Sequence, residues 1–315
     1  MTLHIALVSE SIVVQLGDRL LTVGGEPWDP TANKTIVVEA SNGRAVIGYA
    51  GLAHISGEPT GEWLVRKITG SPASPIGFQF GGSAPLHLGQ IRHRIVSGIE
   101  AEFAKSQPRG RRYSIELIVS GWGYPRVTRD SKRPTSFTYS MSHSGVPGAR
   151  CRIVSTTRYR FRDPSRCWTL SAIGRGDLID LGTINARLSS KNRTLNVDDV
   201  EAEIVSAIRT IGNSVESGVG RDIMSAYLPA FPWTVPPHIR YYRDTSVHDE
   251  RVAYLPAFLA PGMISPAAQM NSSSGFQIVF NADTPDEWCY QTETVPKWTT
   301  PGTRRLNTQE GKRLR

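Results

Sequence analysis

Short apolar runs alternate with turn residues over the first fifty positions, a pattern typical of antiparallel strands. One pair of β-rich runs, 3–9 (LHIALVS) and 11–18 (SIVVQLGD), surrounds a break at Glu10–Ser11. A second pair, 34–40 (KTIVVEA) and 44–51 (RAVIGYAG), surrounds Ser-Asn-Gly. Such breaks between strand-forming runs predict two β-hairpins. The stretch between the hairpins, 24–33 (GGEPWDPTAN), is dense in turn residues and predicts a loop.

Later stretches carry apolar residues every three or four positions, and this period predicts helices. The clearest is 86–105, where one face collects Leu88, Ile91, Ile95, Ile99 and Phe103. A short helix is predicted over 58–69, with Pro59 near its first turn. A long helix is predicted over 195–215, because its acidic residues lie early, at the positive end of the helix dipole. A further helix is expected to start near Asp177.

Strand-like runs return between and after these helices. They cover 113–122, 136–142, 150–156, 166–174, 222–231 and 275–282. The order of strands, two helices, strands, two helices and strands predicts an α+β fold, in which helices pack on a sandwich of antiparallel sheets. The sequence AYLPAF occurs at 226–231 and again at 253–258, and we expect the two copies to be neighbouring strand ends in one sheet.

The composition is that of a globular protein with a substantial core. Hydrophobic residues make up 39% of the 315 and charged residues 20%. The three cysteines form no Cys-x-x-Cys pair, so neither a zinc site nor a disulfide framework is predicted, and no metal or cofactor is expected. We expect a cytoplasmic, reducing location and no membrane partner, because the sequence shows neither a secretory signal nor a long apolar run.

The formal net charge of +8 raises the question of a nucleic-acid partner, but the charge is concentrated at one end. Residues 297–315 contain six Lys or Arg and one acid, so +5 of the charge lies there and about +3 is left for the rest. A basic end of this kind is typical of a solvated, disordered tail. A second basic cluster, RGRR at 109–112, is expected to be a loop. Nucleic-acid binding is therefore the weakest of the functions considered.

Thr2 is the first candidate for chemistry. If Met1 is removed, Thr2 carries both a hydroxyl and a free α-amino group, and an α-amine titrates near 7.7–8.0, so it can serve as a base. Such a nucleophile needs a cation, a carboxylate to hold that cation, and backbone N–H groups for the oxyanion. Asp18 ends the second run of the first hairpin and Lys34 begins the next, so both are expected beside Thr2. Gly51 ends the fourth run, where backbone can approach closely.

Each of these residues also has a plain structural interpretation. Threonine follows methionine in many proteins without consequence, Asp18 can be a turn acid, and Lys34 can be a solvated strand end. Gly51 can mark a turn only. His4 alternates with Thr2 along the first run and so shares its face, where it can be a site residue or a structural one.

Taken together, these residues and motifs resemble the proteasome β-subunits and the related bacterial peptidase of the N-terminal nucleophile (Ntn) hydrolase family. The resemblance rests on the order and spacing of Thr2, Asp18 and Lys34 and on the AGLA that follows. It continues through the helix pair at 58–105 and through three further motifs. These are IELIVSGWG (115–123), SAIGRG (171–176) and SVESG (214–218). It covers about residues 2–230.

The resemblance implies a four-layer αββα sandwich of two antiparallel sheets flanked by helices. It also implies a threonine-dependent amide hydrolase, more narrowly a peptidase, with Thr2 as nucleophile and, through its amine, as base. Lys34 would tune the hydroxyl and Asp18 would orient Lys34. Gly51, with Gly48 as the alternative, would supply an oxyanion N–H, and Ser217 would bond near the amine. Leu21 and Ala50 are predicted to line the substrate pocket.

Two positions depart from the family pattern. Arg175 stands where the turn should carry serine, and Ser214 stands where the family has an acid. These departures favour an alternative, a catalytically silent proteasome-like subunit that serves as a structural or binding module. The partners implied by the resemblance are a peptide or protein substrate, copies of the chain in a homo-oligomeric ring, and an ATPase or other regulator. We divide the chain into a main domain (2–230), an extension with further strands (231–295) and a basic, disordered tail (296–315).

Overall fold

The structure, a computed structural model, describes fifteen stretches of the chain. They are residues 2–23, 26–30, 32–70, 79–80, 87–105, 114–123, 134–155, 168–191, 195–230, 237–244, 252–260, 263–265, 268–271, 279–280 and 287–291. The basic cluster at 109–112 and the predicted tail lie outside them. None of the helices in these stretches combines the length and the apolar character needed to span a membrane.

The first predicted hairpin forms two adjacent interior strands of a seven-stranded antiparallel sheet. Its two strands pair from His4 opposite Gly17 to Val8 opposite Val13, and both are fully buried because helices cover one face and the second sheet covers the other. In spatial order the sheet contains β13 (Trp168–Gly174), β1 (Leu3–Ser9), β2 (Ile12–Asp18), β14 (Ile223–Pro229), β15 (His238–Tyr242), β21 (Glu287–Gln291) and β20 (Val279–Phe280).

The second predicted hairpin lies in an eight-stranded sheet. In spatial order this sheet contains β12 (Arg152–Ser155), β11 (Thr135–His143), β10 (Ile115–Gly123), β6 (Gly43–Gly51), β5 (Thr35–Ala40), β17 (Ala257–Ala260), β18 (Met263–Ser265) and β9 (Gln79–Phe80). All pairs are antiparallel except β5 with β17, which run parallel. The extension therefore contributes strands to both sheets: β15, β20 and β21 to one, β17 and β18 to the other.

Three two-stranded elements complete the described strands: β3 (Leu21–Val23) with β4 (Glu26–Asp29), β7 (His54–Ile55) with β8 (Glu58–Pro59), and β16 (Val252–Leu255) with β19 (Ala268–Asn271). The β3–β4 pair corrects the prediction of a plain loop over 24–33. The sequence held the signal, because Gly-Gly between Val23 and Glu26 is a hairpin dipeptide.

Four α-helices are found in the described stretches, and all four were expected. They are α1 (Thr60–Thr69), α2 (Leu88–Lys105), α3 (Leu181–Lys191) and α4 (Val197–Gly212). The helix expected near Asp177 begins later, at Leu181, because Asp180 caps its first turn by accepting the N–H groups of Gly182 and Thr183. The start of α4 is fixed by Asn196, which accepts from the N–H of Asp198.

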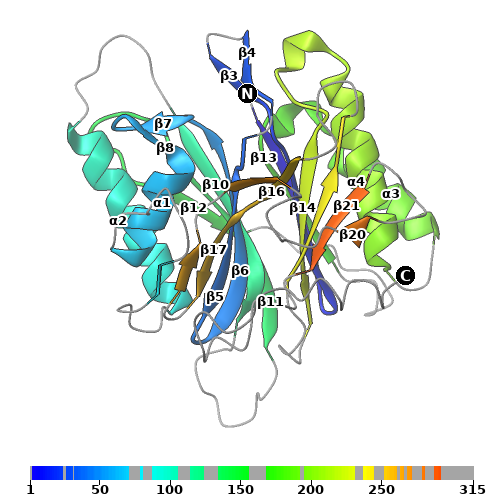
Figure 1. Ribbon diagram of the computed structural model, residues 1–315, viewed down its shortest axis with the longest axis horizontal. Helices are drawn as coiled ribbons and strands as arrows, with labels where there is room; N and C mark the ends of the chain where they lie inside the picture. Colours follow the sequence, from blue (N-terminus) through cyan, green and yellow to red (C-terminus); the bar gives the residue numbers. More distant parts are fainter. Residues whose placement is uncertain are drawn as a thin grey trace.

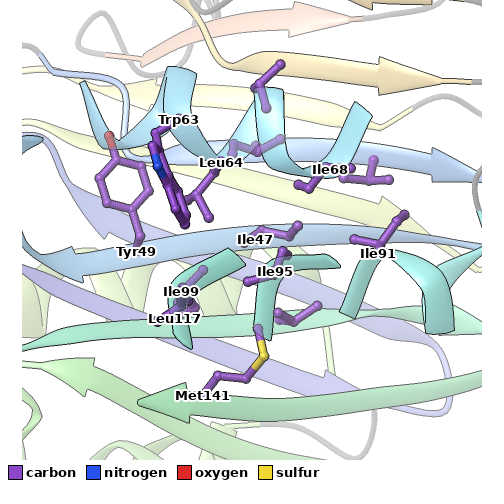
Figure 2. Packing of buried hydrophobic residues seen from close by; sticks show 14 of the residues in the cluster. Ile47, Tyr49, Trp63, Leu64, Ile68, Ile91, Ile95, Ile99, Leu117 and Met141 are labelled. Atoms are coloured by element: carbon purple, nitrogen blue, oxygen red, sulfur yellow. The ribbon is translucent and has the colours of Figure 1, made fainter. Parts of the chain in front are cut away.

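Three apolar clusters show how helices and sheets pack. Helices α1 and α2 cover the eight-stranded sheet, where Trp63, Ile95 and Ile47 meet in one buried cluster (Figure 2). Helices α3 and α4 cover the seven-stranded sheet, where Ile204 of α4 and Ile5 of β1 belong to a second cluster. The two sheets lie between the two helix pairs (Figure 1), and a third cluster contains residues of both sheets. The α+β class with antiparallel sheets is confirmed.

One sequence expectation about strands is wrong. The AYLPAF copies are not neighbours in one sheet: residues 226–229 of the first lie in β14 of the seven-stranded sheet, whereas the second runs from β16 into β17 of the eight-stranded one. The shared sequence did not predict shared pairing, because the strands around each copy decide the sheet that it joins. Within the strand predicted at 275–282 the structure has β20, and β21 follows it and pairs with β15.

Candidate active site

Thr2, Asp18 and Lys34 meet at one end of the seven-stranded sheet. Thr2 directly precedes β1, Asp18 ends β2, and Lys34 directly precedes β5 in the other sheet. The Nζ atom of Lys34 donates to Oγ1 of Thr2 at 2.8 Å and to Oδ2 of Asp18 at 3.2 Å. All three side chains are buried, and Thr2 as a residue is 5% exposed. A hydroxyl, a cation and a carboxylate thus form one connected group.

The Asp18 carboxylate is held by backbone as well as by Lys34. Oδ1 accepts the N–H of Leu3 at 2.6 Å, and Oδ2 accepts the N–H groups of Leu20 at 3.0 Å and Gly220 at 3.1 Å. Hydrogen bonds to an ionised acceptor are shorter and stronger than neutral ones. The carboxylate is therefore fixed in position, and it fixes Lys34 in turn.

The surroundings of Lys34 make its charged form less favourable than it is in water. Burial lowers the pKa of Lys34 from its ordinary value, Asp18 opposes the shift, and the neighbouring Arg19 adds to it. Nζ also donates to the carbonyl oxygen of Leu20, so all three ammonium protons have acceptors. The Thr2 oxygen is then an acceptor toward Lys34 and keeps its own proton to give to a base.

The two glycines proposed for the oxyanion N–H, Gly48 and Gly51, both lie on β6, and each packs against a different neighbour. Gly51 has a φ of +100°, and a Cβ there would lie 2.2 Å from the carbonyl oxygen of Ser114. A Cβ at Gly48 would instead lie 2.4 Å from Nε2 of Gln15. Close packing accounts for both glycines, and the oxyanion role of either stays a prediction. The nearby N–H of Tyr49 donates to the carbonyl of Lys34 at 3.2 Å.

The turn Gly174–Arg175 holds the carbonyl group of Thr2. The N–H of Arg175 donates to the Thr2 oxygen at 2.8 Å. Gly174 has a φ of +74°, and a Cβ there would come within 1.9 Å of the same oxygen and 3.1 Å of the Ala50 Cβ. Ala50 is therefore buried close to Thr2. Leu21 is half-buried and follows Leu20, whose carbonyl accepts from Lys34. Their role as pocket walls stays a prediction.

Ser217 is buried, and its hydroxyl bonds within its own turn. The hydroxyl donates to the carbonyl of Ser214 at 2.7 Å and accepts the N–H of Val219 at 3.1 Å. The link from Ser217 to Thr2 runs through Arg175, whose Nη1 donates to the Ser217 carbonyl at 3.2 Å. Arg175 also pairs with Asp177 at 3.0 Å. The site thus contains a guanidinium where the family pattern has a small hydroxyl.

Backbone groups of the site escaped the sequence prediction. The Leu20 carbonyl and the Gly220 N–H contribute through their backbone, and backbone contacts leave no residue-type signal. His4 is fully buried beside the site. Burial, and then the positive charge of Lys34, lower the pKa of His4 to about 3, so its imidazole is neutral. In the stretches that the structure describes, no three His, Cys, Asp or Glu side chains gather in a way that could hold a metal ion.

Comparison with known proteins gives structural similarity only. No family model matches the chain, and no curated protein matches it. Among solved structures, an Anbu (Gly-1) mutant from Hyphomicrobium sp. strain MC1 is 13% identical with a TM-score of 0.48, over 73% of this chain and 82% of that one. The helical assembly of the Anbu complex from Pseudomonas aeruginosa is 14% identical, with a TM-score of 0.47, over 72% and 81%.

Anbu (ancestral beta-subunit) from Yersinia bercovieri is 12% identical with a TM-score of 0.43, over 72% of this chain and 81% of that one. These identities and TM-scores are low. The function of the chain therefore has to be argued from its own geometry at Thr2, Asp18 and Lys34.

Proposed function

We propose that the chain is a threonine-dependent amide hydrolase, a peptidase that uses Thr2 after removal of Met1. The observation that carries this proposal is the position of Lys34 Nζ, 2.8 Å from Oγ1 of Thr2 and 3.2 Å from Oδ2 of Asp18. A buried Lys–Asp pair aimed at one hydroxyl at the start of the first strand is more than folding requires, because burying two charges is costly.

The chemistry follows from the protons that these groups hold. The freed α-amine of Thr2 accepts the hydroxyl proton as Oγ1 attacks the carbonyl carbon of a peptide bond. Lys34 stabilises the developing negative charge on Oγ1, and a backbone N–H from β6, at Gly51 or Gly48, receives the oxyanion. Collapse expels the leaving amine, which takes the proton, and leaves an ester on Thr2. Water then hydrolyses the ester and restores the hydroxyl.

The architecture supports the same proposal. Helices α1 and α2 pack on one sheet, α3 and α4 on the other, and the sheets meet in a shared apolar cluster. We take these as the layers of an αββα sandwich of the Ntn hydrolase type. Assembly of several copies into a closed or helical oligomer, which would enclose the sites, belongs to the proposal, as does a regulatory partner.

One observation favours the alternative, a catalytically silent subunit. Arg175 brings a guanidinium to the Ser217 carbonyl, and Ser214, which stands in place of an acid, accepts the Ser217 hydroxyl through its backbone carbonyl. In this alternative the Lys34–Asp18 pair only stabilises the fold, and Thr2 keeps Met1.

The deciding experiment combines mass and reactivity. The intact mass of the purified protein shows whether Met1 is removed, and incubation with a β-lactone shows whether Thr2 is acylated. We expect loss of Met1 and one adduct, mapped to Thr2. Thr2→Ser should keep the adduct, and Thr2→Ala should lose it along with hydrolysis of peptide reporters. Retained Met1 together with no adduct would leave the silent subunit as the function.

A further inference from the structure

Two polar side chains lie buried between the sheets next to the candidate site, and the proposed reaction gives neither of them a role. They are His4 on β1 and Gln15 on β2, 0% and 1% exposed. Within the stretches that the structure describes, neither ring nitrogen of His4 and neither amide atom of Gln15 has a hydrogen-bond partner. Buried polar atoms in native proteins are almost always paired, so this pair requires an explanation.

Two glycines make room for the imidazole of His4. Gly17 lies directly opposite His4 in the β1–β2 pair, and a Cβ there would come within 2.2 Å of the ring. Gly48 belongs to β6 in the other sheet, and a Cβ there would lie 2.6 Å from Nδ1 of His4 and 2.4 Å from Nε2 of Gln15. The ring therefore spans the space between the sheets, and the Gln15 amide reaches the same point.

The charges around the ring keep it neutral. Burial is the main cause of the low pKa of His4, the ammonium of Lys34 is the second, and the Tyr49 carbonyl opposes them without the geometry of a hydrogen bond. Asp18 faces Lys34 rather than His4. A neutral imidazole has one N–H donor and one acceptor nitrogen. Nδ1 of His4 and Nε2 of Gln15 both lie beside Gly48, so a small rotation of these side chains would let the Gln15 amide donate to Nδ1 and leave Nε2–H for the Tyr49 carbonyl.

Tyr49 connects this arrangement to the catalytic lysine. Its N–H donates to the carbonyl of Lys34 at 3.2 Å, and its hydroxyl donates to the carbonyl of Asn33 at 3.0 Å. Tyr49 thus holds the chain at Lys34 and at the residue before it. A displacement of the strand at Gly48 and Tyr49 would move the backbone of Lys34, and with it the Nζ atom bound to Thr2.

We propose that His4 is a positioning residue for Lys34, a neutral imidazole held in one tautomer between the Gln15 amide and the Tyr49 carbonyl. It acts through Tyr49 and Lys34 and not on the substrate. Its effect on the rate rests on the proposed function, whereas the tautomer is a property of the fold and can be measured in an inactive protein.

The tautomer is tested first, in the unmodified chain. Long-range ¹H–¹⁵N spectra of protein labelled at histidine nitrogens should show His4 as a single neutral form, protonated at Nε2, from pH 7.5 down to pH 5. Gln15→Leu should convert it to a mixture of tautomers. A mixture in the unmodified protein, or a protonated ring at pH 5, would overturn the proposal.

The positioning role is tested with His4→Phe, which fills the space without polar atoms, and with His4→Asn if that variant does not fold. We expect kcat for a peptide reporter to fall about 10- to 100-fold, the range found for supporting residues of metal sites, at an unchanged KM. The NMR titration of the Lys34 side chain should shift as well. As a control, Ser120→Ala removes a buried hydroxyl from the layer between the sheets and should change neither kcat nor the Lys34 titration.

These measurements separate two kinds of failure. If unmodified protein has no hydrolytic activity but His4 is a single tautomer and His4→Phe shifts the Lys34 titration, the proposed function fails and the positioning role stands. If a folded His4→Phe variant keeps the Lys34 titration and kcat, His4 is a packing residue only and this proposal fails.

Discussion

The N–H of Leu3 donates to Oδ1 of Asp18 at 2.6 Å, so the carboxylate that holds Lys34 also holds the peptide next to Thr2. One side chain therefore fixes the distance between Thr2, the proposed nucleophile, and the Lys34 ammonium. Geometry of this kind, in which one group orients another, is what lets a weak nucleophile react. It also makes Asp18 the residue whose loss should disturb the site most broadly.

Asp18→Asn keeps the shape of the side chain and removes its charge. We expect hydrolysis to fall on the order of 10²- to 10⁴-fold, as when the orienting acid of a catalytic triad is changed to its amide. Since Lys34 would remain buried without its counter-charge, the free energy of unfolding should fall by about 3–5 kcal/mol. Denaturant unfolding and kcat/KM measure the two effects. Asp180→Asn, at the start of α3, is the matched control and should be near neutral, because asparagine caps a helix as well as aspartate.

Gly174→Ala tests the close approach of the turn to Thr2. A Cβ at Gly174 would lie 1.9 Å from the Thr2 carbonyl oxygen, so the turn or Thr2 must move. Gly70 has nearly the same positive φ, +79° against +74°, with nothing within 4 Å of an added Cβ. Gly70→Ala should therefore cost only the conformational term, about 1–2 kcal/mol, and keep activity. Gly174→Ala should cost more and lose activity. Equal melting temperatures for the two variants would contradict the packing described.

The neutrality of His4 has a consequence for stability at acid pH. Its pKa is about 3 in the folded chain against an ordinary value of 6.5, so the unfolded chain binds a proton that the folded chain does not. The free energy of unfolding should therefore fall as the pH falls from about 6.5 toward 3, by up to about 1.4 kcal/mol per pH unit. His4→Gln should lose this slope.

Buried Glu39 changes the free energy of unfolding in the opposite direction to His4 over part of this pH range. Burial raises the pKa of Glu39 to about 7, with Arg44 opposing, so its contribution to stability is present at low pH and is lost as the pH rises through 7. The Glu39 term is common to the wild-type and His4→Gln proteins. Their difference in unfolding free energy, plotted against pH, therefore isolates His4. A flat difference would mean that His4 titrates normally in the folded chain.

Removal of the extension should unfold the chain and not release an intact main domain. Buried Glu201 on α4 accepts from Ser225 at 2.5 Å, and also from Arg240 at 2.6 Å and Tyr242 at 2.8 Å, both on β15. Truncation after Ala230 takes away the last two partners and leaves the edge of β14 unpaired. We expect an aggregating protein without a cooperative melt. Truncation after residue 295 keeps β15 and β21 and should keep the melt.

The sequence was sufficient where local pattern decides structure. The two hairpins follow from apolar runs around short breaks, and a hairpin necessarily returns Asp18 to the start of β1. The helices follow from their three-to-four residue period. The neighbourhood of Thr2, Asp18 and Lys34 could be predicted for this reason, because each residue stands at the end of a predictable element.

Contacts between distant segments could not be predicted in the same way. The parallel pairing of β17 with β5 depends on which strand edge is open, and this is a property of the assembled sheet. The partners of Ser217 depend on the local turn, and the fit of His4 depends on a glycine in the opposite sheet. The alternation of side chains along β1 predicted that His4 shares a face with Thr2. The contact of His4 with Gly48 could be seen only in the folded structure, because Gly48 lies in the other sheet.

The hydrogen bond from Gly220 to Asp18 joins residues 202 positions apart in the chain. Contacts of such long range form late, because much of the chain must be ordered before they close. During synthesis, Thr2, Asp18 and Lys34 leave the ribosome long before Gly220 does. The carboxylate therefore lacks one of its ligands for most of translation. We expect a nascent chain to carry an incomplete site. Under the proposed function, it should therefore be unable to hydrolyse other nascent chains before its own synthesis is complete.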